Sequence, residues 1–391
     1  MKKVLSTLLA VAMVATMLVG CGNNASTEAA ADATGAETFK IGGIGPVTGG
    51  AAVYGIAVKN GAQIAVDEIN AAGGINGYQI EYNFQDDECD AEKSVNAYNT
   101  LKDWDMDILM GTVTSGCCVA VAAKTVEDNM FELTPSGSSV DIVTGNDNVF
   151  QVCFTDPNQG IASAQYIAGK GLATKIGIIY DSSDVYSTGI YEKFVSEAAN
   201  QGLEVVATEA FTADNKTDFT TQLQKIKDAG AELVFLPFYY TEATLVLKQA
   251  DTMGFAPIFF GCDGLDGILA VENFDVALAE DVMLLTPFAA DATDEKTANF
   301  VKKYNELYGE TPNQFAADAY DAMYIIKAAL EAKSATPAMS VSELGDACKA
   351  AMVEIKVDGI TGEAMTWNAG GEVNKAPKAV IIKDGAYKAV D

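Results

Sequence analysis

The stretch that decides the fold is residues 39–77, FKIGGIGPVTGGAAVYGIAVKNGAQIAVDEINAAGGING. It begins with an apolar strand over residues 40–44 and continues through a glycine-rich turn. A helix follows, in which apolar residues recur every three or four positions, and it ends at Gly73-Gly74. A strand, a turn and an amphipathic helix in this order form one repeating unit of an α/β sheet.

The same unit recurs along the chain. One series of units runs to about residue 150, and a second begins near residue 159 and continues to about residue 285. Two long helices near 293–308 and 315–332 and a short β-rich tail come last. The expected strands are 40–44, 80–85, 108–110, 131–133, 175–180, 204–208, 233–236, 258–260 and 282–285. Strands that alternate with helices predict parallel sheets covered by helices, and the length predicts two α/β lobes between which the chain crosses.

The first residues predict export. Lys2 and Lys3 precede an apolar run over residues 4–18, which is too short to span a bilayer comfortably. Small residues and Cys21 follow, as in a bacterial lipobox, where the thiol receives a diacylglyceryl group. The alternative is an ordinary signal peptide with an incidental cysteine. We expect residues 1–20 to be the signal peptide and residues 21–37 to be a lipidated cysteine with a flexible tether, anchored to the outer face of the cell membrane.

Composition disfavours several functions. All 25 basic residues are lysine, and the sequence contains neither arginine nor histidine. Catalytic triads and metal sites that depend on histidine are therefore excluded, and we expect no enzyme activity, no cofactor and no metal. The formal charge is −29, or −31 without residues 1–20, which makes nucleic acid a poor partner but hardly affects a zwitterion. Without arginine, an anionic group must be held by hydroxyls, backbone N–H groups, helix N-termini or lysine.

Three turns of the first lobe carry hydroxyl groups and glycines where strands end. Tyr54 follows the first strand, Ser115 follows the strand at 108–110, and the next strand is followed by Ser136-Gly137-Ser138. Helix capping alone explains such residues at any one turn. Because ligands bind beyond the carboxyl ends of parallel strands, the three turns together predict a carboxylate site made without arginine.

The corresponding turns of the second lobe carry aromatic and acidic residues. Tyr186, Tyr239 and Asp263 each follow a strand of the second series. A carboxylate at a cleft can pair with an ammonium group, and tyrosines supply apolar area and cation–π attraction. The alternative is that these side chains belong to the core or cap helices.

With these residues assembled, the chain resembles the branched-chain amino-acid-binding proteins of ABC transporters, the leucine/isoleucine/valine type of solute-binding protein. The resemblance covers nearly all of residues 38–391. Its most specific parts are residues 45–55, 66–77 (VDEINAAGGING), 86–90 (DDECD), 134–135 (TP), 154–160 (FTDPNQG) and 249–254.

The resemblance implies a type I periplasmic binding protein, in which two Rossmann-like lobes joined by a hinge close on a ligand. It implies an N-terminal lobe of residues 38–157 plus 287–355 and a C-terminal lobe of 158–286 plus 356–391. In that family the closed protein delivers its ligand to membrane permease subunits. The expected partners are therefore a small-molecule amino acid, branched-chain or otherwise apolar, and an ABC transporter permease, with the protein acting as a monomer.

The resemblance also assigns roles to residues. Ser115 and the turn at Ser136, Gly137 and Ser138 would bind the ligand carboxylate, and the same turn with Tyr186 and Asp263 would bind the ammonium. Tyr54 and Tyr239 would line the side-chain pocket. The leucine-type proteins have a glutamate where this chain has Asp263, so an amide- or urea-binding protein of the same transporter family stays an alternative, as does a sensory ligand-binding protein. A Cys89 disulfide with Cys117 or Cys118 is also left open.

Overall fold

The structure is a computed structural model that describes residues 37–390, and it contains two sheets. The signal peptide, Cys21 and the tether that we predicted lie outside the described residues, apart from Glu37. Within the described residues, no helix is both long enough and apolar enough to cross a membrane.

The first sheet has five strands in the order β2-β1-β3-β4-β5, and every pairing is parallel. Its strands are β1 (Thr38–Gly45), β2 (Gln79–Asp86), β3 (Ile108–Gly111), β4 (Glu132–Thr134) and β5 (Val149–Gln151). The helices between them are α1 (Ala52–Ala71), α2 (Ala91–Asp103) and α3 (Ser115–Asp128), with the short 3₁₀ helix η1 (Val140–Ile142).

The second sheet has seven strands in the order β12-β11-β10-β9-β8-β6-β7. Its strands are β6 (Lys175–Asp181), β7 (Glu204–Phe211), β8 (Leu233–Leu236), β9 (Ile258–Gly261), β10 (Met283–Thr286), β11 (Lys378–Lys383) and β12 (Ala386–Val390). The helices of this part are α4 (Asp156–Lys170), α5 (Val185–Asn200), α6 (Thr220–Asp228) and α7 (Tyr240–Thr252), with the 3₁₀ helices η2 (Asp263–Leu265), η3 (Ile268–Ala270) and η4 (Val276–Ala279). Strands β6 to β10 pair in parallel, whereas β11 and β12 add an antiparallel edge.

Strands β7-β6-β8-β9-β10 repeat the order of the first sheet. In both series the second strand lies on one side of the first strand and the third lies on the other. Such a reversal leaves a crevice at the carboxyl ends of the two central strands, where ligands of open α/β sheets bind. The α/β prediction with two Rossmann-like sheets is therefore confirmed, and each sheet has its own crevice.

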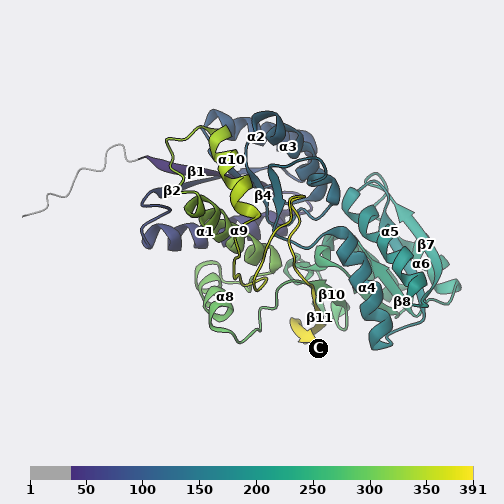
Figure 1. Cartoon of the computed structure of the whole chain (residues 1–391). Coiled ribbons are helices and arrows are strands. Elements are labelled where there is room, and N and C mark those ends of the chain that lie inside the picture. The colour runs from purple at the N-terminus through teal and green to yellow at the C-terminus, as the bar shows by residue number, and fades with distance from the viewer. Residues whose placement is uncertain (1–36, 391) are drawn as a thin grey trace, which may run out of the picture. The chain divides into compact units, whose positions relative to one another are not determined.

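Three helices that come late in the sequence are α8 (Glu295–Tyr308), α9 (Gln314–Ala332) and α10 (Val341–Met352). Helix α9 packs along α1, and α10 packs against α9, so the chain has returned to the first sheet (Figure 1). The approach is close because α1 has a glycine at the contact: a Cβ on Gly61 would collide with the carbonyl of Ala316.

The chain reaches the second sheet again later than we predicted. The prediction assigned residues 356–391 to the C-terminal lobe. Instead, the Trp367 indole N–H donates to the carbonyl of Gln151 in β5 at 2.8 Å, and Lys375 pairs with Asp318 of α9 at 2.9 Å. The next element to join the second sheet is β11, which begins at Lys378. The boundary near residue 355 is thus corrected, because buried polar contacts hold the segment against the first sheet.

Candidate ligand-binding site

One cavity is lined by residues that follow strands of both sheets. It is lined by Tyr54, Val113, Thr114, Ser115, Ser136, Tyr186, Tyr239, Asp263, Gly264 and Phe315. The turns after β1, β3 and β4 contribute from the first sheet, and the turns after β6, β8 and β9 contribute from the second. The carboxyl ends of both sheets therefore meet at this cavity.

The side of the cavity formed by the first sheet offers hydrogen-bond donors. Ser115 is the first residue of α3, and the preceding Thr114 makes no side-chain cap to the helix. The first N–H groups of a helix have no partner within the helix and carry partial positive charge. The Ser115 Oγ accepts the N–H groups of Ser138 and Ser139, both at 3.3 Å, so it ties the start of α3 to the turn after β4. This arrangement suits a carboxylate in a chain that has no arginine.

The side formed by the second sheet carries a buried carboxylate. Asp263 is only 3% exposed, and its Oδ1 accepts a hydrogen bond from the Tyr186 hydroxyl at 2.7 Å. The same hydroxyl accepts the N–H of Gly264 at 2.9 Å. Burial raises the pKa of Asp263 to about 7, although the Tyr186 hydrogen bond opposes the shift. Within residues 37–390, no lysine lies at ion-pair distance from Asp263, so a ligand cation would be its counter-ion.

Aromatic rings close the remaining wall. The Tyr54 ring lies 4.1 Å from the Phe315 ring and 5.5 Å from the Tyr239 ring, centroid to centroid. The Tyr54 hydroxyl donates to the carbonyl of Gly264 and accepts the N–H of Tyr240 at 3.3 Å. Helix α1 is therefore bonded directly to two turns of the second sheet, across the cavity, and the wall beside it is apolar.

Six of the eight predicted ligand-binding residues line this cavity: Tyr54, Ser115, Ser136, Tyr186, Tyr239 and Asp263. Gly137 and Ser138 are not among its lining residues, and their ligand-binding role stays a prediction. The Gly137 N–H donates to Thr134 Oγ1 at 2.8 Å, and a Cβ on Gly137 would collide with Cys118. The same turn is bonded to a lining residue, because the Ser138 N–H donates to Ser115 Oγ at 3.3 Å. Cys21, the predicted lipidation site, lies outside the described residues.

Phe315 is a cavity residue that the sequence analysis missed. It is the second residue of α9, whose N-cap is Asn313. The Asn313 side chain accepts the N–H of Ala316 at 3.2 Å, and this cap could have located the helix start in the sequence. Nothing in the local sequence shows that this helix start reaches the cavity, because that depends on the packing of α9 on α1.

The six cysteines among the described residues are all free thiols. Cys118 accepts a hydrogen bond from the Thr112 hydroxyl at 2.8 Å and is fully buried. Cys89 and Cys117 are hydrogen-bonded to each other, and this contact lowers the pKa of Cys89. Of the two disulfide partners left open for Cys89, the structure brings Cys117 closer.

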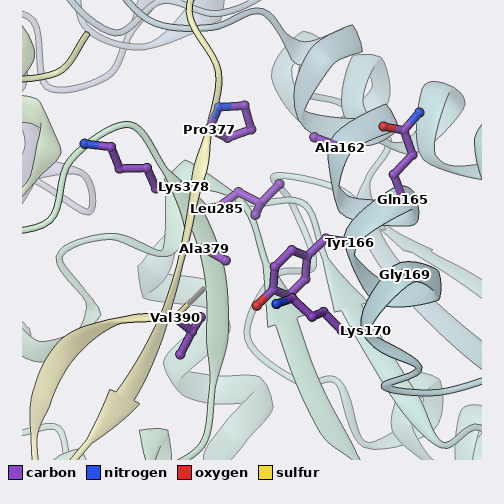
Figure 2. A pocket seen from close by; sticks show the side chains of 10 residues that line it. All are labelled: Ala162, Gln165, Tyr166, Gly169, Lys170, Leu285, Pro377, Lys378, Ala379 and Val390. Carbon is purple, nitrogen blue, oxygen red and sulfur yellow. The ribbon is translucent and has the colours of Figure 1, made fainter. Parts of the chain in front are cut away.

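A separate hollow lies between α4 and the β10–β11 region. It is lined by Ala162, Gln165, Tyr166, Gly169, Lys170, Leu285, Pro377, Lys378, Ala379 and Val390 (Figure 2). None of these residues comes from the turns that follow the strands of the first sheet. The cavity around Asp263 is the better candidate because it combines donors, a buried carboxylate and an apolar wall.

Comparison with known proteins identifies the family. Residues 38–386 match the family model described as periplasmic binding protein. The chain belongs to the periplasmic binding protein family. This periplasmic binding protein is 30% identical to a Leu/Ile/Val-binding protein homologue of Brucella melitensis over 76% of the chain and 79% of the relative. It is 29% identical to the leucine-, isoleucine-, valine-, threonine- and alanine-binding protein of Pseudomonas aeruginosa over 76% of the chain and 79% of the relative.

A solved structure agrees with these relatives. The branched-chain amino acid transporter substrate-binding protein LivJ of Streptococcus pneumoniae, in complex with isoleucine, superposes with a TM-score of 0.81 at 29% identity. The match covers 90% of this periplasmic binding protein and 99% of the other chain. The expected resemblance to a type I, two-lobe solute-binding protein is thereby confirmed.

Proposed function

We propose that this periplasmic binding protein captures an amino acid with an apolar side chain, most plainly a branched-chain one, and delivers it to an ABC transporter permease. The observation that carries the proposal is the composition of the cavity. It combines the N-terminus of α3, an aromatic wall and the buried Asp263, which has no lysine partner among residues 37–390. These three features suit the carboxylate, the ammonium and the side chain of one amino acid.

In this proposal Ser115 and the first N–H groups of α3 hold the carboxylate, and Asp263 with Tyr186 holds the ammonium. Tyr54, Tyr239 and Phe315 contact the ligand side chain. The relatives named for binding leucine, isoleucine and valine support this class of ligand. No bond is made or broken; the ligand stabilises the closed arrangement of the two lobes, and the permease recognises that arrangement.

The proposal extends to the location of the protein. We propose that the export signal and Cys21 anchor it outside the cytoplasmic membrane, where it works as a monomer. Labelling with a radioactive fatty acid in cells would test the anchor, with a Cys21→Ala variant as the control.

The ligand is tested by calorimetric titration of the purified protein after carried-over ligand is removed by unfolding and refolding. We expect one-to-one binding of leucine, isoleucine or valine. Binding of urea or a short amide, with no response to any amino acid, would refute the proposal and favour the amide-binding alternative. The ionised form of Asp263, which has no counter-ion among residues 37–390, argues against that alternative, because a neutral amide would leave its charge unpaired.

A further inference from the structure

Helices α1 and α7 begin where the two lobes touch, and neither helix is capped by the side chain of its own N-cap residue. The N-cap of α1 is Ala51 and the N-cap of α7 is Tyr239. The first N–H groups of a helix have no acceptor within that helix, so a buried helix start needs a partner from elsewhere. Because α1 follows β1 of the first sheet and α7 follows β8 of the second, each helix can supply the partner of the other.

Two tyrosines supply these partners reciprocally. The Tyr240 hydroxyl accepts the N–H of Val53 in the first turn of α1 at 3.2 Å. The Tyr54 hydroxyl accepts the N–H of Tyr240, the first residue of α7, at 3.3 Å. Both side chains are buried, and their rings meet edge to face with centroids 4.8 Å apart. Each tyrosine therefore belongs to one helix and caps the other across the lobes.

A third hydrogen bond joins the same two turns. The Thr241 hydroxyl donates to the carbonyl of Gly50 at 2.5 Å. We call these three bonds, between residues 50–54 and residues 240–241, the interlobe latch. Separation of the lobes would break all three bonds and leave both helix starts uncapped. Tyr240 and Thr241 are not among the residues that line the ligand cavity, so they would favour closure without contacting the ligand.

We infer that the interlobe latch sets how much of the unliganded protein is closed, and that Tyr240 is thereby a positioning residue for ligands that it does not contact. The inference rests on the proposed function, in which the ligand binds by stabilising the closed lobes. Apparent affinity scales with the fraction of the protein that is already in the binding-competent form. The latch therefore raises the affinity for every ligand by one common factor, whereas the residues that line the cavity distinguish one ligand from another.

Tyr240→Phe tests the latch because it removes the hydroxyl and keeps the ring. The loss of one neutral hydrogen bond should lower the calorimetric affinities for leucine and valine by the same factor, roughly threefold to tenfold. Tyr191→Phe removes a half-buried hydroxyl of α5 in the second lobe, and as the matched control it should change neither affinity. Unchanged affinities in Tyr240→Phe, or a leucine-to-valine ratio that shifts more than about twofold, would overturn the inference.

Hydrogen exchange of single amides reports the two caps directly. In the unliganded protein, Tyr240→Phe should speed the exchange of the Val53 amide several-fold, and Tyr54→Phe should do the same to the Tyr240 amide. Saturating leucine should slow both amides in the wild-type protein, because it holds the lobes closed. If the Val53 amide exchanges at the wild-type rate in Tyr240→Phe, or if leucine slows neither amide, the caps do not depend on closure and the inference is wrong.

Thr241→Val gives a second route if Tyr240→Phe fails to fold. It removes the donor to the Gly50 carbonyl and keeps the shape of the side chain, so we expect an equal, several-fold loss for leucine and valine. Unchanged affinities would show that the latch does not contribute to closure. Wild-type protein that ignores all amino acids would instead refute the proposed function, and exchange of the Val53 amide in the unliganded protein would still decide whether the latch forms.

Discussion

The charge of Asp263 can be tested by Asp263→Asn, which changes little else. Asparagine has nearly the same shape, and its side-chain oxygen can still accept the Tyr186 hydroxyl that now lies 2.7 Å from Oδ1. Asp263 is 3% exposed, so water cannot replace the lost charge. Removing one partner of a buried charged pair costs about 2 to 5 kcal/mol, which raises the dissociation constant for leucine from about 30-fold to several thousand-fold.

The pKa of Asp263 adds a pH dependence to this prediction. Burial raises that pKa to about 7, so about half of the unliganded protein carries the ionised carboxylate at neutral pH. Only the ionised form pairs with an ammonium, and apparent affinity scales with the competent fraction. The leucine affinity of the wild-type protein should therefore fall about tenfold for each pH unit below 7, whereas the affinity of Asp263→Asn should be nearly independent of pH.

The same shift predicts the stability of the unliganded protein. The folded-state pKa lies above the unfolded value, so the folded state holds its proton more tightly and the stabilisation is fully present below about pH 4. It is lost as the pH rises through about 7, by up to roughly 4 kcal/mol. Asp263→Asn should abolish this component of the pH dependence.

The assay is calorimetric titration with leucine between about pH 5 and pH 8, together with urea unfolding without ligand over the same range. Asp251→Asn is the control, because Asp251 is an exposed residue of α7. The reasoning is refuted if Asp263→Asn binds leucine within about twofold of wild type and keeps the same pH dependence, since both results would remove Asp263 from the ammonium site.

Three further predictions concern other contacts. Lys375→Met should destabilise the protein by about 3 to 5 kcal/mol in urea unfolding, because it leaves Asp318 without its buried partner at 2.9 Å. Adding Asp318→Asn should restore much of the lost stability. An unchanged unfolding midpoint for Lys375→Met would contradict the pairing. Tyr54→Phe should cost about 1 to 3 kcal/mol of leucine affinity but little folding stability, because the Tyr54 hydroxyl joins α1 to the carbonyl of Gly264. An equal loss of folding stability would assign this hydroxyl to the core. Ser138→Ala should weaken leucine binding in calorimetry without lowering the thermal midpoint, whereas a lower midpoint with unchanged affinity would assign that hydroxyl to the structure of the turn.

Much of the fold and of the candidate site follows from the sequence, because both depend on local patterns. The nine predicted strands match β1 to β4 and β6 to β10. The carboxyl ends of parallel strands share one edge, so residues placed directly after strands had to approach one another within each sheet. For that reason the sequence predicts two groups of neighbouring residues: Ser115 with Ser136, and Tyr186 with Tyr239 and Asp263.

Some local elements were missed although the sequence carries a signal for them. Helix α10 starts with a capping box in which Ser340 and Glu343 exchange hydrogen bonds, a pattern visible in the sequence. Strand β5 has three residues, which is too short for any periodicity to be detected.

The remaining features depend on contacts between distant segments, and the tertiary structure alone decided them. Phe315 reaches the cavity because α9 packs on α1, which the missing side chain of Gly61 permits. Residues up to Lys375 stay on the first sheet because Asp318 and Gln151 hold them there through buried polar contacts. Asp156 is buried because α4, α5 and the Ser138 turn enclose it together. Local sequence patterns determine which helices and strands form and which residues follow each strand end. The burial of side chains and the contacts between distant elements arise only when the chain has packed.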